Sequence, residues 1–194
     1  VPAGNDIFPI ELVEKYFKNS KDLVDLIRND GYKINEKLSA REEAIRRIKE
    51  FKHIIEDCDG YKNLYFKGQQ IVKEKELQRL FRFVWVDTTF KVDAEANNGR
   101  GQTDFIVSKG QFNQNIIEFK LASNKTLGHV FEQVEIYEAA NSSKKSLIVI
   151  FYFTEEEQLF AEREITKAGH EKEIGESIFL IDCRMDNKTS ASKV

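Results

Sequence analysis

The sequence predicts an α/β fold, in which a central mixed sheet of about four to five strands is flanked by helices and preceded by a helical segment. From residue 69 onward, apolar residues at helical spacing alternate with short runs rich in β-branched and aromatic residues, an order typical of α/β domains. Residues 146–153 form a nearly unbroken run of this kind, typical of a central strand buried on both faces. Before residue 60 the apolar residues recur at helical spacing. We therefore expect three parts, which are a helical segment at 1–60, an α/β domain at 61–185 and a polar tail at 186–194.

The segment before residue 60 is expected to contain helices only. Two short helices carry the apolar residues of 12–17 and 23–27. A third helix is better supported, because Ser39 and Glu42 have the spacing of a capping box and an apolar stripe follows them. We interpret this region as packing or linkage without chemistry of its own.

Each element of the α/β domain has its own signal. Apolar residues at helical spacing predict helices at 77–84, 127–140 and 154–165, the last of them capped by Thr154. Alternating or β-branched runs predict strands at 88–92, 103–107, 115–121, 146–153 and 177–181. Turn residues at 97–101 and 109–110 separate the first three strands.

Charge and cysteine content exclude several classes of protein. The 30 basic residues are balanced by 33 acidic ones, giving a net charge of -3, so any contact with nucleic acid requires a local basic patch. Cys58 and Cys183 are far apart and show no CxxC or Cys/His ligand spacing, and the 3 histidines are scattered. Neither a disulfide framework nor a zinc site is therefore expected.

Targeting signals are also missing from the sequence. No apolar run is long enough to span a membrane, and the N-terminus has no signal-like apolar stretch. We expect a cytoplasmic protein without membrane contacts. The chain starts at Val1 and its single methionine is Met185, which predicts that it is part of a longer polypeptide.

Charged residues on two neighbouring predicted strands carry the main functional signal. Asp104 lies on one strand, and Glu118 and Lys120 lie on the next. Because side chains alternate along a strand, Glu118 and Lys120 project from the same face. Asp104, Glu118 and the Phe119 carbonyl are oxygen ligands of the kind that Mg²⁺ binds, and Lys120 would lie beside the attacking water. This combination suits phosphodiester hydrolysis, in which cation and ammonium neutralise the developing negative charge.

Asp104 followed by Glu118-x-Lys120 on the next strand resembles the signature of the PD-(D/E)XK nuclease superfamily. Thr103 stands where that signature usually has proline, a change that leaves every ligand in place. The order of the predicted elements from 69 to 153 also resembles the core of the superfamily. The resemblance implies a restriction-endonuclease-like fold, Mg²⁺ or Mn²⁺ as cofactor, and DNA, less often RNA, as substrate.

The resemblance implies further site residues on two helices. The helix before the sheet usually supplies a glutamate that orients the site or binds a second metal, and Glu74 is the first candidate and Glu76 the second. Gln133 and Tyr137, on the helix after the third strand, resemble the Gln-x-x-x-Tyr element of RecB-like nucleases. One helical turn separates these two residues, so both can reach one site and position substrate or ligands there.

The function expected from these residues is that of a Mg²⁺-dependent endodeoxyribonuclease, acting as the effector domain of a defence or repair protein. Arg100 and Lys125 are the expected contacts to DNA phosphates. The resemblance also implies a homodimer that pairs two active sites. Two alternatives stay open, which are a non-catalytic DNA-binding or partner-docking domain that retains the nuclease fold, and a helical interaction module led by the segment before residue 60. A Mg²⁺-dependent rise in melting temperature would distinguish the enzyme from a docking domain.

Overall fold

A computed structural model defines two compact units, Val1–Leu38 and Ser39–Val194, and the second contains the sheet. The described residues are 38–70, 73–97, 102–110, 113–132 and 146–188, together with Glu14, Lys18, Lys21 and Asp22. These last four residues are helical. Glu14 falls within the first predicted short helix, and the rest of the two predicted short helices lies outside the described residues.

The second unit is built on a five-stranded mixed sheet with the order β3-β4-β5-β6-β7. Its strands are β3 (Lys91–Asn97), β4 (Gln102–Ser108), β5 (Gln114–Leu121), β6 (Leu147–Tyr152) and β7 (Ile178–Asp182). The first three strands form an antiparallel meander, and β6 and β7 then join parallel to β5. A separate small hairpin pairs β1 (Tyr65–Phe66) with β2 (Gln69–Gln70). The predicted α/β class with a mixed central sheet is confirmed.

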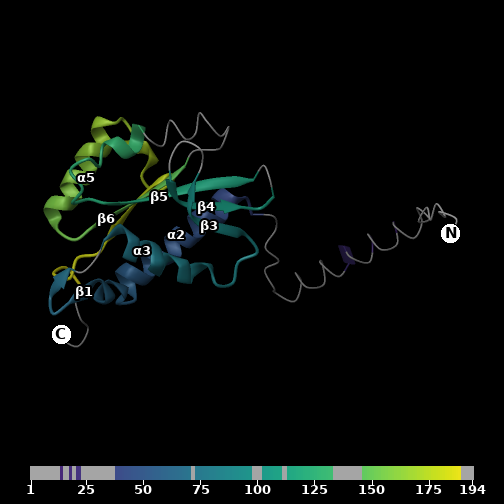
Figure 1. The fold of residues 1–194 in the computed structure, drawn as a ribbon, viewed down its shortest axis with the longest axis horizontal. Coiled ribbons are helices and arrows are strands. Elements are labelled where there is room, and N and C mark those ends of the chain that lie inside the picture. The colour runs from purple at the N-terminus through teal and green to yellow at the C-terminus, as the bar shows by residue number, and fades with distance from the viewer. Residues whose placement is uncertain are drawn as a thin grey trace. The chain divides into compact units, whose positions relative to one another are not determined.

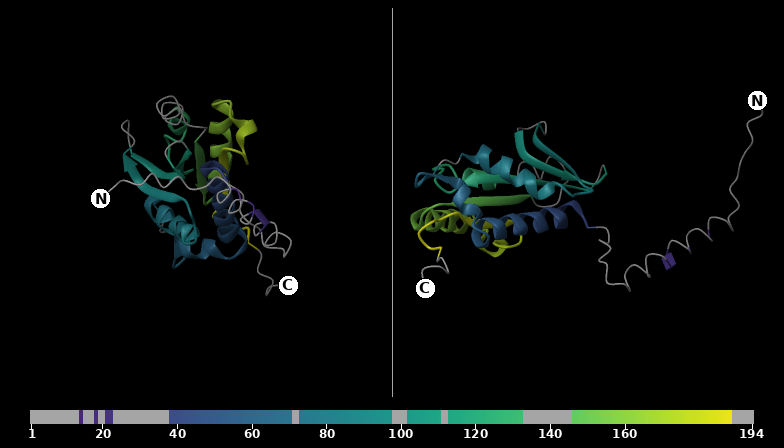
Figure 2. Two further views of the ribbon diagram at one scale, coloured as in Figure 1. Left: turned by 90° about the vertical axis from the view of Figure 1, so that its right-hand side faces the viewer. Right: turned by 90° about the horizontal axis from the view of Figure 1, so that it is seen from below.

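Helices cover both faces of this sheet (Figure 1). Helices α2 (Ala40–Asp57) and α3 (Glu74–Phe81) lie on one face, and α5 (Glu155–Lys167) lies on the other. The left view of Figure 2 shows the blue helices and the yellow-green α5 on opposite sides of the strands. The connections include the short 3₁₀ helices η1 (Gly60–Leu64), η2 (Arg82–Trp85) and η3 (Glu171–Glu173). In the described ranges, no helix has both the length and the apolar character that crossing a membrane requires.

Side-chain caps determine where α2 and α5 begin. The Glu42 amide donates to Ser39 Oγ at 3.2 Å, and the Ser39 amide donates to Glu42 Oε2 at 2.8 Å. At the start of α5, the Glu157 amide donates to Thr154 Oγ1 at 3.1 Å. Each bond satisfies an amide that has no acceptor within its own helix. Both predicted caps are confirmed.

An aromatic cluster joins α2 and α3 to the sheet. Its members are Phe51 of α2, Phe81 of α3, and Phe105, Phe119 and Phe151 from β4, β5 and β6. Neighbouring ring centroids lie 5.0 to 6.2 Å apart, mostly in edge-to-face or tilted contacts that favour aromatic pairs. Helix α2 is therefore part of the compact unit that begins at Ser39, whereas the sequence predicts a separate helical segment as far as residue 60.

A second apolar cluster lies on the opposite face, beneath α5. It includes Ile148, Ile150 and Tyr152 of β6 together with Ala161 and Ile165 of α5. The intervening residues of β6 face the aromatic cluster, because side chains alternate along a strand. All residues of β6 are buried, so the prediction of a central strand buried on both faces is confirmed.

Some element boundaries differ from the prediction. Strand β3 begins at Lys91 rather than at Thr88, because Thr88 Oγ1 accepts a hydrogen bond from the Phe90 amide at 3.1 Å and holds the chain in a turn. Of the helix predicted at 127–140, residues 129–132 are helical, and the part from residue 133 lies outside the described residues. Most of the turn predicted at 97–101 lies outside them too.

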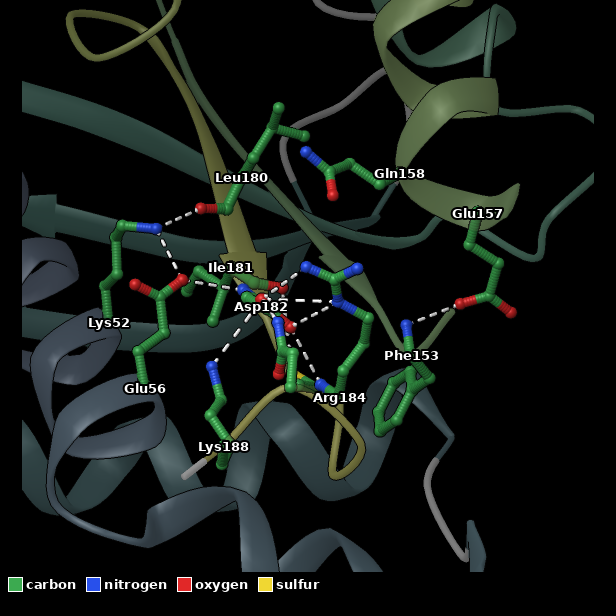
Figure 3. Close-up of polar contacts among 12 residues, drawn as sticks. Lys52, Glu56, Phe153, Glu157, Gln158, Leu180, Ile181, Asp182, Arg184 and Lys188 are labelled. Atoms are coloured by element: carbon green, nitrogen blue, oxygen red, sulfur yellow. Dashed lines mark hydrogen bonds and ion pairs between the residues drawn. The ribbon is translucent and has the colours of Figure 1, made fainter. Parts of the chain in front are cut away.

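Charged side chains of α2 close the outer edge of the sheet (Figure 3). Strand β7 is an edge strand, and its outward backbone groups require partners other than a strand. Lys52 Nζ donates to the Leu180 carbonyl at 2.6 Å, and the Asp182 amide donates to Glu56 Oε1 at 2.7 Å. Lys52 and Glu56, one helical turn apart, therefore occupy the positions where a further strand would pair.

Candidate active site

Strands β4 and β5 separate at the point where the predicted acidic residues lie. The last pair of their ladder is Phe105 opposite Ile117. Beyond this pair β4 continues beside β3, and β5 continues beside β6. Asp104 and Glu118 are the next residues on the two strands. They therefore lie where β4 and β5 diverge, a place that we call the fork. On the side that faces the fork, the amides of β5 have no strand partner.

Two carboxylates replace the missing strand along β5. The Phe119 amide donates to Asp104 Oδ2 at 2.6 Å, and the Leu121 amide donates to Glu74 Oε1 at 3.2 Å. Alternate amides of a strand point to the same edge, so both bonds lie within the fork. The Phe119 carbonyl faces the fork as well, because the N–H and C=O groups of one strand residue share an edge.

Gln78 holds the second oxygen of Asp104. Its Nε2 donates to Asp104 Oδ1 at 2.6 Å. Gln78 follows Glu74 by four residues on α3, so both side chains project from the same face of that helix toward the fork. The sequence prediction missed Gln78, although its spacing from Glu74 is the signal that could have identified it.

Glu118 is a buried carboxyl next to a second carboxyl. It is 4% exposed, and burial, followed by the negative charge of Asp104, raises the pKa of Glu118 to about 8. Burial also raises the pKa of Asp104. Ionising both carboxyls at such short range is unfavourable, so the pair favours holding a proton or a cation.

Lys120 supplies a positive charge beside these acids. Its Nζ lies 3.9 Å from Glu118 Oε2 and 3.9 Å from Glu74 Oε2, and its side chain is 18% exposed. These separations are those of ion pairs rather than of hydrogen bonds, which are shorter. The ammonium is thus held next to the fork without a close bond to either acid.

The oxygen ligands at the fork suit a hard divalent cation. Across the described ranges, no three Asp, Glu, His or Cys side chains converge into a complete cage for an ion. Mg²⁺ does not require one, since it commonly uses one or two carboxylates together with waters and substrate oxygens. Asp104, Glu118 and the Phe119 carbonyl provide such a set. Among the described residues Oε1 of Glu118 has no hydrogen-bond partner, which leaves this buried oxygen available to a cation.

The backbone of β3 has an unusual conformation across from the fork. Glu95 has a φ of 55°, a region that non-glycine residues rarely adopt. The residues on either side of it pair with Phe105 and Thr103, so Glu95 lies opposite Asp104. Its carboxylate pairs with Lys75 Nζ of α3 at 3.0 Å. Backbone strain of this kind concentrates at functional sites.

Of the other predicted site residues, Glu76 and Lys125 are described and the rest are not. Glu76 Oε2 accepts a hydrogen bond from the Lys73 amide at 3.0 Å and so stabilises the start of α3. Of the two candidate glutamates, Glu74 is therefore the one in contact with β5. Lys125 is exposed in the turn after β5, and Arg100, Gln133 and Tyr137 lie outside the described residues.

A family model matches a continuous part of the chain that includes the fork. The family is described as Domain of unknown function (DUF8371), and the match covers residues 40–155, more than half of the 194 residues. The chain belongs to this family. The DUF8371 range starts with α2, in agreement with a compact unit that begins at Ser39, and it contains Glu74, Asp104 and Lys120. No curated protein and no solved structure matches the chain.

Proposed function

We propose that this DUF8371 domain is a metal-dependent nuclease that hydrolyses phosphodiester bonds of DNA, with the site arrangement of the PD-(D/E)XK superfamily. The observation that carries the proposal is the fork between β4 and β5. At this one point an acid pair, buried Glu118 and half-buried Asp104, meets the ammonium of Lys120 and the α3 carboxylate of Glu74. A purely structural ion pair would not require a second carboxyl beside the buried Glu118.

The topology around the fork supports the same proposal. Helix α3 is followed by the antiparallel meander β3-β4-β5 and then by the parallel strand β6. This is the order of a restriction-endonuclease-like core, with the acids on the second and third strands of the meander. Fold alone does not determine function, so the proposal depends mainly on the residues of the site.

Asp104, Glu118 and the Phe119 carbonyl would hold Mg²⁺ or Mn²⁺. When bound, such a cation would lower the pKa of a water molecule and neutralise negative charge on the phosphate. Gln78 and the Phe119 amide fix the orientation of Asp104 at 2.6 Å each, so this ligand is positioned in advance. Because the pKa of each acid is raised, a cation would compete with protons for this pair, and its binding would depend on pH.

The Lys120 ammonium lies beside the acid pair. Its positive charge would neutralise the negative charge that develops on the phosphate during the reaction. Glu74 accepts a hydrogen bond from the Leu121 amide of β5, and its second oxygen lies 3.9 Å from Lys120 Nζ. Gln133, Tyr137, Arg100 and Lys125 remain proposals for substrate positioning. The proposed biological role is that of an endonuclease effector in defence or repair.

A cleavage assay tests the proposal. Supercoiled plasmid, linear duplex and single-stranded DNA are incubated with the full chain and Mg²⁺, Mn²⁺ or EDTA. We expect metal-dependent nicking or cutting of at least one substrate, and its loss in Asp104→Ala and in Lys120→Ala with circular dichroism unchanged. Equal nicking by either variant would contradict the assigned site, and absence of cleavage of all three substrates would favour a docking domain.

A further inference from the structure

A second cluster of reactive side chains lies at the C-terminal end of α2, a helix that contributes no side chain to the fork. His53 Nδ1 lies 2.8 Å from Asp57 Oδ2, and His53 Nε2 lies 3.6 Å from Cys58 Sγ. The side chains of His53 and Asp57 are both 64% exposed, and Cys58 is an exposed free thiol. An ion in solution can therefore reach the sulfur and the ring nitrogen.

The Asp57 carboxylate determines which nitrogen of His53 is available. A carboxylate can only accept a hydrogen bond, so Nδ1 carries a proton, and in the neutral ring the lone pair is on Nε2. That lone pair is on the side of the ring next to Cys58 Sγ. A histidine whose other nitrogen donates to a carboxylate is the usual form of a zinc-binding histidine.

The separation between sulfur and nitrogen fits one tetrahedral cation. Zinc binds thiolate sulfur at about 2.3 Å and imidazole nitrogen at about 2.0 to 2.1 Å, so two such ligands at a tetrahedral angle are roughly 3.6 Å apart. The distance from Cys58 Sγ to His53 Nε2 is 3.6 Å. The two atoms therefore have the spacing of a chelate without any rearrangement of the chain.

The backbone holds Cys58 in this position. Cys58 is the C-cap residue of α2, and Asp59 then takes a left-handed conformation with a φ of 61°. At Gly60 the chain turns back against the helix so closely that a Cβ atom there would lie 2.5 Å from the Ile54 carbonyl oxygen. Only glycine fits at this point, and the tight turn fixes the distance between residue 58 and the last turn of α2.

The electrostatics of the helix end distinguish a metal site from a reactive thiolate. The last carbonyls of a helix carry partial negative charge, which stabilises a cation and destabilises an isolated thiolate. Thiolate and imidazole ligands also select zinc-like cations over Mg²⁺. We propose that Cys58 and His53 bind a zinc-like divalent cation, that Asp57 orients His53, and that water or a ligand from another molecule completes the tetrahedron.

Cobalt(II) added to the full chain is the probe for this site. We expect a thiolate-to-cobalt charge-transfer absorption that is lost in Cys58→Ser and in His53→Ala, and an affinity about tenfold or more lower in Asp57→Asn. Cys183→Ala is the matched cysteine control, because Cys183 is buried, and it should retain the absorption. Asp104→Asn should retain it as well, which separates this site from the proposed nuclease centre.

Two outcomes would overturn the proposal. One is the absence of the absorption from the wild-type chain or its persistence in Cys58→Ser. The other outcome is seen with DTNB, a disulfide reagent that reacts with the Cys58 thiol. If the site binds Zn²⁺, added Zn²⁺ should slow this reaction in the wild-type chain. A fast reaction that Zn²⁺ does not slow, and that His53→Ala reduces, would identify a reactive thiol in place of a metal site.

Discussion

The Phe119 amide donates to Asp104 Oδ2 at 2.6 Å, in the position where a neighbouring strand would provide a carbonyl. This bond forms because the ladder between β4 and β5 ends at Phe105 and Ile117. Because the ladder opens, amides of β5 lack strand partners. Asp104 accepts a hydrogen bond from one of them and therefore lies beside Glu118. The fork and the acid pair are therefore a single feature of the fold.

Glu74 and Glu76 form a matched pair for testing which helix acid serves the site. Glu74→Gln keeps an acceptor for the Leu121 amide but removes the charge that pairs with Lys120. We expect this change to lower metal-dependent cleavage by about tenfold or more with little change in stability. Glu76→Gln, at the position that caps α3, should cleave at the wild-type rate. If Glu76→Gln is the more damaged variant, the assignment of the two residues is reversed.

Gln78 is predicted to act through Asp104. Gln78→Ala removes the donor at 2.6 Å from Asp104 Oδ1, and we expect cleavage to fall by about 10- to 100-fold, as for other side chains that orient a metal ligand. The free energy of unfolding should fall by about 1 to 3 kcal/mol, measured by urea denaturation. Gln114→Ala, at an exposed position on β5, is the control and should change neither quantity. Wild-type cleavage by Gln78→Ala would show that Asp104 needs no such support.

Asp182 makes the folded state sensitive to acid. Burial opposes its ionisation, but hydrogen bonds from Arg184 and Asn187 and the charge of Lys188 lower the pKa of Asp182 to about 2, from an ordinary value of 3.8. Because the folded-state pKa is the lower one, this stabilisation is complete above about pH 4 and is lost as the pH falls toward 2. Its size is about 2 kcal/mol.

The variant Asp182→Asn tests this account of acid sensitivity. Its free energy of unfolding should be lower than that of the wild type at pH 7, and the difference should shrink between about pH 4 and pH 2. Asp186→Asn, a change at an exposed position four residues later, serves as the control. A difference between wild type and Asp182→Asn that stays constant over this range would show that the carboxylate is not the source.

Much of the fold could be predicted from local signals. The capping box at Ser39, the cap at Thr154 and the apolar run of β6 each specify their element through neighbouring residues. The membership of α2 in the sheet unit could not be predicted in this way. It depends on Phe51 meeting Phe81 and Phe151, contacts between residues far apart in the sequence.

The same limit explains what was missed at the sites. The spacing of Glu118 and Lys120 on one strand predicted that they share a face, and their Nζ to Oε2 distance of 3.9 Å agrees with it. The spacing of Gln78 from Glu74 places both on one helix face, but the bond from Gln78 to Asp104 depends on the opening of the ladder, which no local pattern encodes. The pair His53 and Cys58 was missed because their contact depends on the tight turn at Gly60 rather than on a standard ligand spacing.

Mn²⁺ binding measured by isothermal titration calorimetry tests most directly whether Asp104 and Glu118 share a cation. The parent chain should carry Cys58→Ser, so that the cluster on α2 does not contribute. We predict one Mn²⁺ bound per chain, and an affinity at least about tenfold lower in Glu118→Gln. The melting temperature of Glu118→Gln without metal should stay equal or rise, because a neutral amide replaces a buried carboxyl whose ionisation burial and Asp104 disfavour. Equal Mn²⁺ affinity in parent and Glu118→Gln, or no binding by the parent, would contradict the account.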